Sequence, residues 1–182
     1  MRLGARLLAG ILSGISLAPV LTSLPRSAPA IRTVESFTSQ DGVVPGGALE
    51  LAVRVTLRSG FHLNSHTPSQ TFLIPTTLET EPLPGVTFGE WGYPKGEARR
   101  FSFAEDPIQV YEGTIVIRGS VKIAGNAMPG RRRAVTRLRF QACTTDRCYP
   151  PGREEVVLDF RVVPPGQATR PQHPDLFQDV HP

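Results

Sequence analysis

Cysteine is scarce in this chain, with only two among 182 residues, and the sequence has one tryptophan, two methionines and four histidines. One methionine is the first residue and the other is Met128, so there is no methionine-rich copper signature. His62 and His66 are the histidines nearest to each other in the chain, and we interpret them as ordinary structural residues rather than metal ligands. No glycine-rich phosphate loop lies between a strand and a helix. We therefore predict neither a metal nor another cofactor.

Long apolar runs are absent after the first thirty residues. Within those thirty, Arg2 and Arg6 form a basic start, an uncharged and largely apolar run covers residues 7–25, and residues 28–30 read Ala-Pro-Ala, a small-x-small cleavage site. We predict a signal peptide over residues 1–30 and a periplasmic or secreted protein. The competing interpretation is an uncleaved N-terminal membrane anchor. Glycine, serine and proline interrupt the run, however, and its apolar centre is short for a bilayer span.

The positive charge of the sequence is largely a property of this leader. The chain has 20 lysines and arginines against 16 acidic residues, and the leader contains Arg2, Arg6 and Arg26 but no acid, which leaves 17 against 16. A nearly neutral mature chain does not predict nucleic-acid binding. Residues 131–133 are three consecutive arginines, which we interpret as a solvated turn and the outer face of a strand.

Apolar and polar residues alternate along much of the remaining chain, a pattern typical of half-buried strands. Prolines and glycines, 18 and 17 in number, occur too often for long helices. Many short strands separated by turns predict one all-β domain over residues 31–163, an immunoglobulin-like antiparallel β-sandwich. The strongest alternation covers residues 49–58, 115–123, 137–142 and 155–162, and weaker strand signals cover residues 31–37, 71–79 and 86–89.

The last part of the sequence has a different character. Residues 164–182 contain many prolines and little that a core would bury, so we predict a disordered tail. We expect no specific role for its histidines, His173 and His181.

The two cysteines, Cys143 and Cys148, are separated by four polar residues that fit a hairpin loop. Residues opposed across an antiparallel ladder have Cα atoms about 4.5–5.5 Å apart, which a disulfide accepts. Cys143 shares the strand parity of Gln141 rather than that of Phe140 and Ala142, which carry the apolar pattern. We therefore expect Cys143 to point away from the core.

A pair with this spacing fits either a local structural staple or a redox-active disulfide. The closed loop is short, so the chain-entropy model gives a stabilisation of only roughly 2 kcal/mol. Arg147 would favour a thiolate at Cys148, and Asp146 would oppose it. No histidine is adjacent to either cysteine in the sequence. A cysteine hydrolase that used His62 or His66 as its base is disfavoured, because in an oxidising compartment Cys148 could bind the nucleophile Cys143 in a disulfide.

At these residues the sequence resembles the amino-terminal periplasmic domain of the thiol:disulfide interchange protein DsbD. The resemblance runs from about residue 33 to residue 163, although this chain has one residue fewer between its cysteines than the best-known members. The segments that carry it are Phe-Gln-Ala-Cys at 140–143, Cys-Tyr-Pro-Pro at 148–151, Gly-Phe-His-Leu-Asn-Ser-His-Thr-Pro at 60–68, Phe-Leu-Ile-Pro-Thr at 72–76 and Tyr-Glu-Gly at 111–113.

The resemblance implies a protein-disulfide reductase component that passes reducing equivalents to partner proteins. By that resemblance Cys148 attacks the partner's disulfide and Cys143 resolves the mixed disulfide. The implied partners are thioredoxin-like or other periplasmic thiol-disulfide proteins. The family also shields its cysteines with a cap loop, which matches residues 100–107 here, with Phe103 or Phe101 as the cap. Without the resemblance, both phenylalanines would be interpreted as core residues. For Phe101 we favour the core interpretation over the cap role even with the resemblance.

The printed chain contains nothing that resembles the membrane or thioredoxin-like domains of the family, so we expect a membrane electron donor in trans. Asp146, Arg147 and Tyr149 form the expected environment of the pair. Residues 61–64 fit a strand end with a satisfied histidine and an asparagine that caps a turn. The alternative function is a secreted β-sandwich binding module in which Cys143–Cys148 is only a structural loop disulfide.

Overall fold

The structure, a computed structural model, describes residues 30–102 and 104–177, and its regular structure there is almost entirely β-strand. All but the last residue of the predicted signal peptide lies outside the described residues. Within the described part of the chain, no helix has the length and apolar character needed to cross a membrane.

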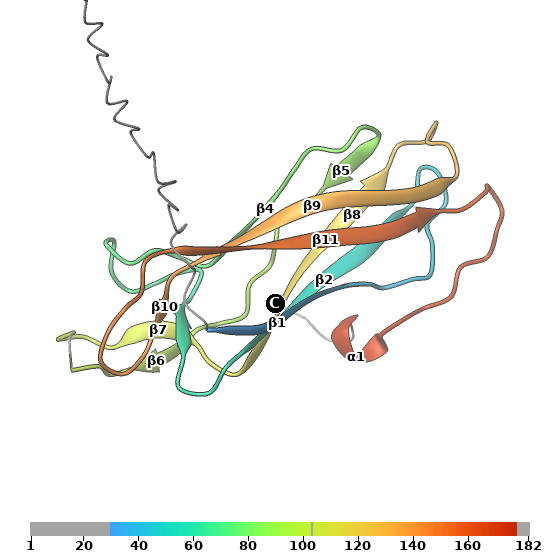
Figure 1. Cartoon of the computed structure of the whole chain (residues 1–182). Helices are drawn as coiled ribbons and strands as arrows, with labels where there is room; N and C mark the ends of the chain where they lie inside the picture. Colours follow the sequence, from blue (N-terminus) through green and yellow to red (C-terminus); the bar gives the residue numbers. More distant parts are fainter. Residues whose placement is uncertain (1–29, 103, 178–182) are drawn as a thin grey trace, which may run out of the picture.

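Two antiparallel sheets form the two layers of a sandwich (Figure 1). The edge strands β1 and β11 also meet, since the Ser36 hydroxyl donates a hydrogen bond to the Val157 carbonyl at 2.7 Å. The first sheet has the order β1 (Ile31–Thr38), β2 (Ala48–Leu57), β8 (Thr114–Ile123), β5 (Val86–Phe88), and the second has the order β11 (Gly152–Val162), β9 (Gly130–Phe140), β4 (Thr77–Thr80).

The alternating apolar residues of the long strands fill the space between these layers. Each fully buried aliphatic or aromatic side chain contributes roughly 1.5–3 kcal/mol relative to its exposed state. The central strands β2 and β8 pair over nine positions, from Ala48↔Lys122 to Thr56↔Thr114, which fixes the face that each side chain occupies. The core includes Leu51, Val53, Val55, Ile117, Val121, Leu138, Phe140 and Leu158.

A third sheet, built from short strands, lies at one end of the sandwich (Figure 1, lower left). Its inner residues Leu63, Tyr111 and Ala142 join the main core. A second, smaller apolar cluster of Leu73, Ile108 and Val110 supports the other side. The sheet has the order β10 (Ala142–Cys143), β3 (His62–Asn64), β7 (Ile108–Tyr111), β6 (Glu97–Arg99).

The predicted all-β, immunoglobulin-like sandwich is confirmed, and the strong alternating stretches become β2, β8, β9 with β10, and β11. Of the weaker signals, 31–37 and 86–89 match β1 and β5, but only the end of 71–79 is a strand, β4. The sequence does not predict β6 or β7. Strands of three or four residues are too short to establish an alternation.

The arginines of β9 lie mostly on its outer face, as the sequence predicts: Arg131, Arg133, Arg137 and Arg139 alternate with buried positions, whereas Arg132 has the parity of those buried positions. Neighbouring strands place acidic side chains beside them, so the cluster is largely neutralised. The pKa of Asp159 is lowered because its carboxylate accepts hydrogen bonds from Arg131. The ion pairs on this face are Arg131–Asp159, Arg133–Asp159, Arg137–Glu81 and Arg139–Glu79.

Residues 164–177 differ from the disordered tail that the sequence predicts, because they pack against the first sheet. They end in the short helix α1 (Pro174–Phe177), where Leu176 is buried. The Arg118 guanidinium of β8 donates a hydrogen bond to the Leu176 carbonyl at 2.7 Å. His173, to which the sequence assigns no role, packs edge-on against Phe37 with ring centroids 4.9 Å apart.

The composition of this segment gives no sign of these contacts, since they depend on hydrogen bonds to residues far away in the sequence. His181 and the rest of residues 178–182 lie outside the described part of the chain.

Candidate functional site

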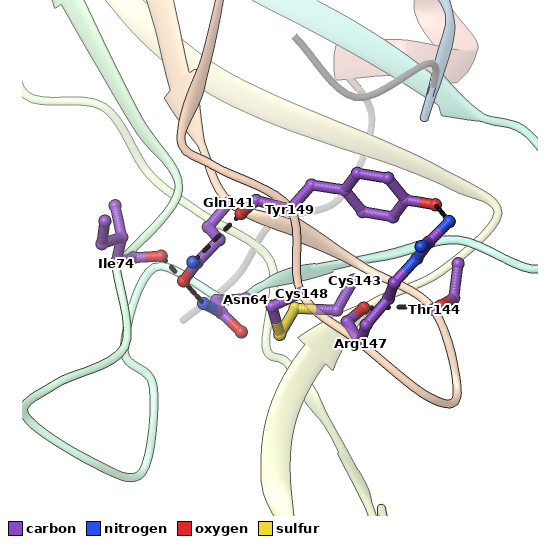
Figure 2. The surroundings of a disulfide bond; sticks show 8 residues. All are labelled: Asn64, Ile74, Gln141, Cys143, Thr144, Arg147, Cys148 and Tyr149. Carbon is purple, nitrogen blue, oxygen red and sulfur yellow. Dashed lines mark hydrogen bonds between the residues drawn. A yellow bond between two sulfur atoms is a disulfide. The ribbon is translucent and has the colours of Figure 1, made fainter. Parts of the chain in front are cut away.

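Cys143 and Cys148 form a disulfide across a tight hairpin (Figure 2). Backbone hydrogen bonds flank the pair, from Thr144 N to Arg147 O and from Tyr149 N to Ala142 O, both at 2.8 Å. The cysteines therefore occupy a non-hydrogen-bonded pair, the arrangement that brings Cα atoms closest. Their Cα atoms lie 3.9 Å apart, closer than the expected spacing of about 4.5–5.5 Å. The predicted pairing across a hairpin is confirmed.

The two cysteines differ sharply in exposure. Cys148 is exposed, whereas Cys143 retains only 1% of its accessible surface. Ala142 belongs to the main core, while Cys143 belongs to neither apolar cluster. Strand parity thus predicts the direction of Cys143 correctly but not its burial.

His62 lies directly opposite Cys143 in the pairing of β3 with β10. Opposed residues of an antiparallel pair share a face, with Cβ atoms about 4.5–5.5 Å apart. His62 itself is 4% exposed. The sequence places no histidine next to a cysteine, but strand pairing brings this one across from a residue 81 positions away. The only sequence signal for this neighbour is the 60–68 segment of the family resemblance.

Burial lowers the pKa of the His62 imidazole from its ordinary value of 6.5, because a charged ring is poorly solvated there. The negative charge of Glu112 acts in the opposite direction and is the weaker influence. His62 is therefore a neutral imidazole at neutral pH.

Phe101 covers His62. Their rings are stacked with centroids 4.3 Å apart and planes inclined by 21°. Phe101 also packs, partly buried, against the small cluster of Leu73, Ile108 and Val110. Phe103, the other predicted cap residue, lies outside the described residues.

A pocket of about 610 Å³ opens beside the hairpin. Thr145 of the hairpin loop lines it together with His62 and Phe101, and Arg32 and Arg58 contribute positive charge to its wall. A space that admits small groups therefore lies beside His62 and the hairpin loop.

A network of amide hydrogen bonds holds the hairpin on the side away from its loop, to the left of the cysteines in Figure 2. The buried Asn64 side-chain amide donates to Ile74 O at 3.1 Å and to the Gln141 side-chain oxygen at 3.2 Å. The Gln141 side-chain amide donates to Tyr149 O at 3.2 Å. Asn64 therefore connects three segments, instead of capping a turn as the sequence predicts.

Arg147 and Tyr149, two of the residues predicted to surround the cysteine pair, contact each other. The Arg147 guanidinium donates to the Tyr149 hydroxyl at 3.1 Å and lies 5.1 Å from the centre of that ring. Figure 2 shows this side chain extending away from the sulfur atoms. Asp146 is exposed in the loop. Tyr149 also packs against Phe61, with ring centroids 5.8 Å apart, and so ties the hairpin to the base of β3.

The second histidine of the segment has separate contacts. His66 stacks on Tyr93 with centroids 3.7 Å apart, and its Nδ1 lies 3.1 Å from Thr76 O. The Tyr111 hydroxyl accepts a hydrogen bond from His66 N. Within residues 30–102 and 104–177, no cluster of three or more potential metal ligands occurs.

The fold and site define an all-β domain that carries one disulfide hairpin with an exposed and a buried cysteine. The chain belongs to the family of the N-terminal domain of the thiol:disulfide interchange protein DsbD, whose family model matches residues 33–159. The resemblance inferred from the motifs is thereby confirmed. Comparison with curated protein sequences gives no match.

Solved structures of related domains are similar at low sequence identity. The reduced DsbD N-terminal domain of Neisseria meningitidis is 19% identical, with a TM-score of 0.44, over 79% of this chain and 91% of that one. The N-terminal periplasmic domain of ScsB from Proteus mirabilis is 12% identical, with a TM-score of 0.44, over 68% of this chain and 44% of that one. A complex of the DsbD and PilB N-terminal domains from Neisseria meningitidis contains a chain 19% identical, with a TM-score of 0.37, over 76% of this chain and 89% of that one.

Proposed function

We propose that this chain relays electrons between proteins by thiol–disulfide exchange, with Cys148 as the attacking residue and Cys143 as the resolving one. The observation that carries the proposal is the contrast in burial: Cys148 is exposed at the hairpin and Cys143 is 1% exposed. Exchange requires a thiolate to reach a sulfur atom in line with the disulfide bond. Only Cys148 offers that access.

The exchange balances without a cofactor. In the reduced domain the Cys148 thiolate attacks a partner disulfide, which forms a mixed disulfide and releases one partner thiolate. The Cys143 thiolate then attacks the Cys148 sulfur, restores the Cys143–Cys148 disulfide and releases the second partner thiolate. Two electrons pass to the partner. A dithiol donor, proposed to be a membrane protein acting in trans, returns the domain to its reduced form by the reverse sequence.

The environment of the pair supports these roles. His62 lies opposite the buried Cys143 and Phe101 stacks on His62, which fits a cap that limits access to one sulfur, and Phe103 is proposed as a second cap residue. Tyr149 and Gln141 hold the hairpin in place while the disulfide opens, since their hydrogen bonds do not involve sulfur. We propose thioredoxin-like proteins as partners and the periplasm as the location.

The hairpin geometry also bears on the alternative of a structural staple. Backbone hydrogen bonds close the hairpin on both sides of the cysteines, and the amide network anchors it to β3 and to Ile74. A disulfide adds only roughly 2 kcal/mol to a loop of this size. A stapling role therefore explains little that these contacts do not already provide.

Single-cysteine variants test the proposal. Cys143→Ser should accumulate a mixed disulfide with an oxidised thioredoxin-like protein, detected by non-reducing electrophoresis and mass spectrometry, because the resolving thiol is absent. Cys148→Ser is the matched control and should form none. Equal adduct formation by the two variants, or no adduct with either, would contradict the proposed roles. Retention of partner binding by the double serine variant, with no exchange in the unaltered chain, would favour the binding module.

A further inference from the structure

The buried Cys143 and the buried His62 imidazole face the same side of the short-stranded sheet. Cys143 and His62 are register partners in β10 and β3, and they retain 1% and 4% of their accessible surface. The Phe101 ring stacks on His62, with ring centroids 4.3 Å apart. His62 is therefore placed close to the sulfur that attacks the mixed disulfide in the second step of the proposed exchange.

The resolving step requires Cys143 as a thiolate, and its burial opposes that charge. Apolar surroundings raise the pKa of a thiol because the thiolate is poorly solvated. A bound partner covers the exposed side of the hairpin and excludes more water. The proton of Cys143 therefore needs an acceptor within the protein.

We infer that His62 accepts the proton of the Cys143 thiol as Cys143 attacks the mixed disulfide. This inference rests on the proposed function and assigns a residue to its second step. The S–H bond of Cys143 transfers its proton to an imidazole nitrogen, the Cys143–Cys148 bond forms, and the bond from Cys148 to the partner breaks. The partner sulfur leaves as a thiolate and takes up the proton from His62 or from water.

The surrounding charges are consistent with this assignment. Glu112, which follows β7, acts on His62 through space and favours the protonated ring. Glu112 is itself paired with Arg99 at 3.1 Å. Arg32 of β1 and Arg58, which follows β2, line the same pocket as His62. Their positive charges oppose protonation of the His62 ring. The neutral imidazole is therefore the resting form, and Glu112 offsets part of the cost of protonation.

A symmetric aromatic disulfide with a coloured thiolate product separates the two steps. Mixed with the reduced chain, it should release one thiolate when Cys148 attacks and a second when Cys143 resolves. Cys143→Ser should show the first phase alone. His62→Gln should leave the first phase unchanged and slow the second on the order of a hundredfold at neutral pH, a size typical of a lost proton acceptor.

His66→Gln is the matched control, because it removes a histidine of the same segment that contacts Tyr93 and Thr76 instead. It should leave both phases unchanged. Two further measurements distinguish proton transfer to His62 from a purely structural role of this residue. The second phase of His62→Gln should rise steeply with pH, whereas that of the unaltered chain should be flat near neutrality. Added imidazole should accelerate the second phase of His62→Ala, since the adjacent pocket admits small groups.

A titration of the unaltered chain covers the case in which the His62 variants do not fold. The His62 ring signals, followed by NMR, should titrate differently in the oxidised form and in the form with a free Cys143 thiol. Identical titrations, or an unchanged second phase in His62→Gln, would overturn the inference and leave the exchange function standing. Absence of even the first phase in the unaltered chain would instead overturn the proposed function.

Discussion

The central sandwich and the short-stranded sheet at its end are held together in different ways. Strands β2, β8, β9 and β11 are ten or eleven residues long and bury alternating apolar side chains between two layers. Strands β3, β6, β7 and β10 have two to four residues and depend on side-chain hydrogen bonds from Asn64, Gln141 and Tyr111. The sandwich thus supplies most of the buried apolar surface that stabilises the fold, and the small sheet positions the cysteine hairpin.

This contrast explains where the cysteines lie. The proposed exchange requires a disulfide that folding does not depend on, and neither cysteine belongs to the main core. The exchange also requires a hairpin that keeps its position when the disulfide opens, and the hydrogen bonds of Asn64 and Gln141, which involve no sulfur atom, are suited to that task. Variants that act on one region and not on the other test this division.

The largest expected loss of stability is in the sandwich. Ile117→Ala removes a side chain with no exposed surface from β8, and it should lower the free energy of unfolding by about 2–5 kcal/mol, through lost burial and the cavity left behind. Urea unfolding measures this loss. Exchange with the aromatic disulfide, measured where both proteins are folded, should be unchanged. A slower exchange would show that the two regions are coupled.

Asn64→Ala should act mainly on the site. It leaves Ile74 O and the Gln141 side-chain oxygen without their donor, at a cost of about 1–3 kcal/mol. A looser hairpin keeps the two thiols apart more of the time, so the disulfide should become easier to reduce. Equilibration with glutathione buffers measures this change.

Thr136→Val is the matched variant in the sandwich, because the buried Thr136 hydroxyl bonds to that of Thr80 at 3.0 Å. It should cost about 1 kcal/mol and leave the reduction potential unchanged. Equal shifts of potential in this variant and Asn64→Ala would argue against a special role for the network.

A smaller effect should come from acid. The folded-state pKa of His62 lies below 6.5, so the unfolded chain binds the proton more readily. The contribution of His62 is complete above that pH and declines as the pH falls from about 6.5 toward the lowered folded-state pKa. Urea midpoints measured across this window should fall more steeply for the unaltered chain than for His62→Gln. A curve for His66→Gln that parallels that of His62→Gln would refute the assignment to His62.

The smallest effect should come from the outer face of the sandwich. The Arg139–Glu79 pair has side chains 44% and 58% exposed, and Glu79→Gln should change the free energy of unfolding by less than about 1 kcal/mol. The change should shrink further in high salt, because exposed charges are screened. A larger loss, insensitive to salt, would mean that the pair is less exposed in solution.

The sequence predicts the sandwich well and the small sheet poorly, for a physical reason. Ten residues of β2 or β8 repeat the apolar alternation often enough to identify a strand and its buried face. The three residues of β6 cannot do so. The packing of residues 164–177 is also missed. Their proline-rich composition shows that they have few apolar side chains to bury, but it does not show which distant residues they contact.

The candidate site divides in the same way. Chain spacing alone predicts that Cys143 and Cys148 meet across a hairpin, because a four-residue loop leaves little choice of partner. Parity predicts that Cys143 turns from the core. The family motifs identify the 60–68 segment as related to the cysteines, although they do not state the contact between His62 and Cys143.

The sequence by itself therefore determined the β-sandwich, the disulfide hairpin and the family, since each depends on residues close together in the chain. Only the tertiary structure decided which cysteine is buried, which histidine lies opposite it and which aromatic ring stacks on that histidine. Those features require β10 to pair with β3, 81 positions earlier at the Cys143–His62 pair, and Phe101 to stack on His62. Contacts between distant segments depend on the whole fold, and local pattern does not record them.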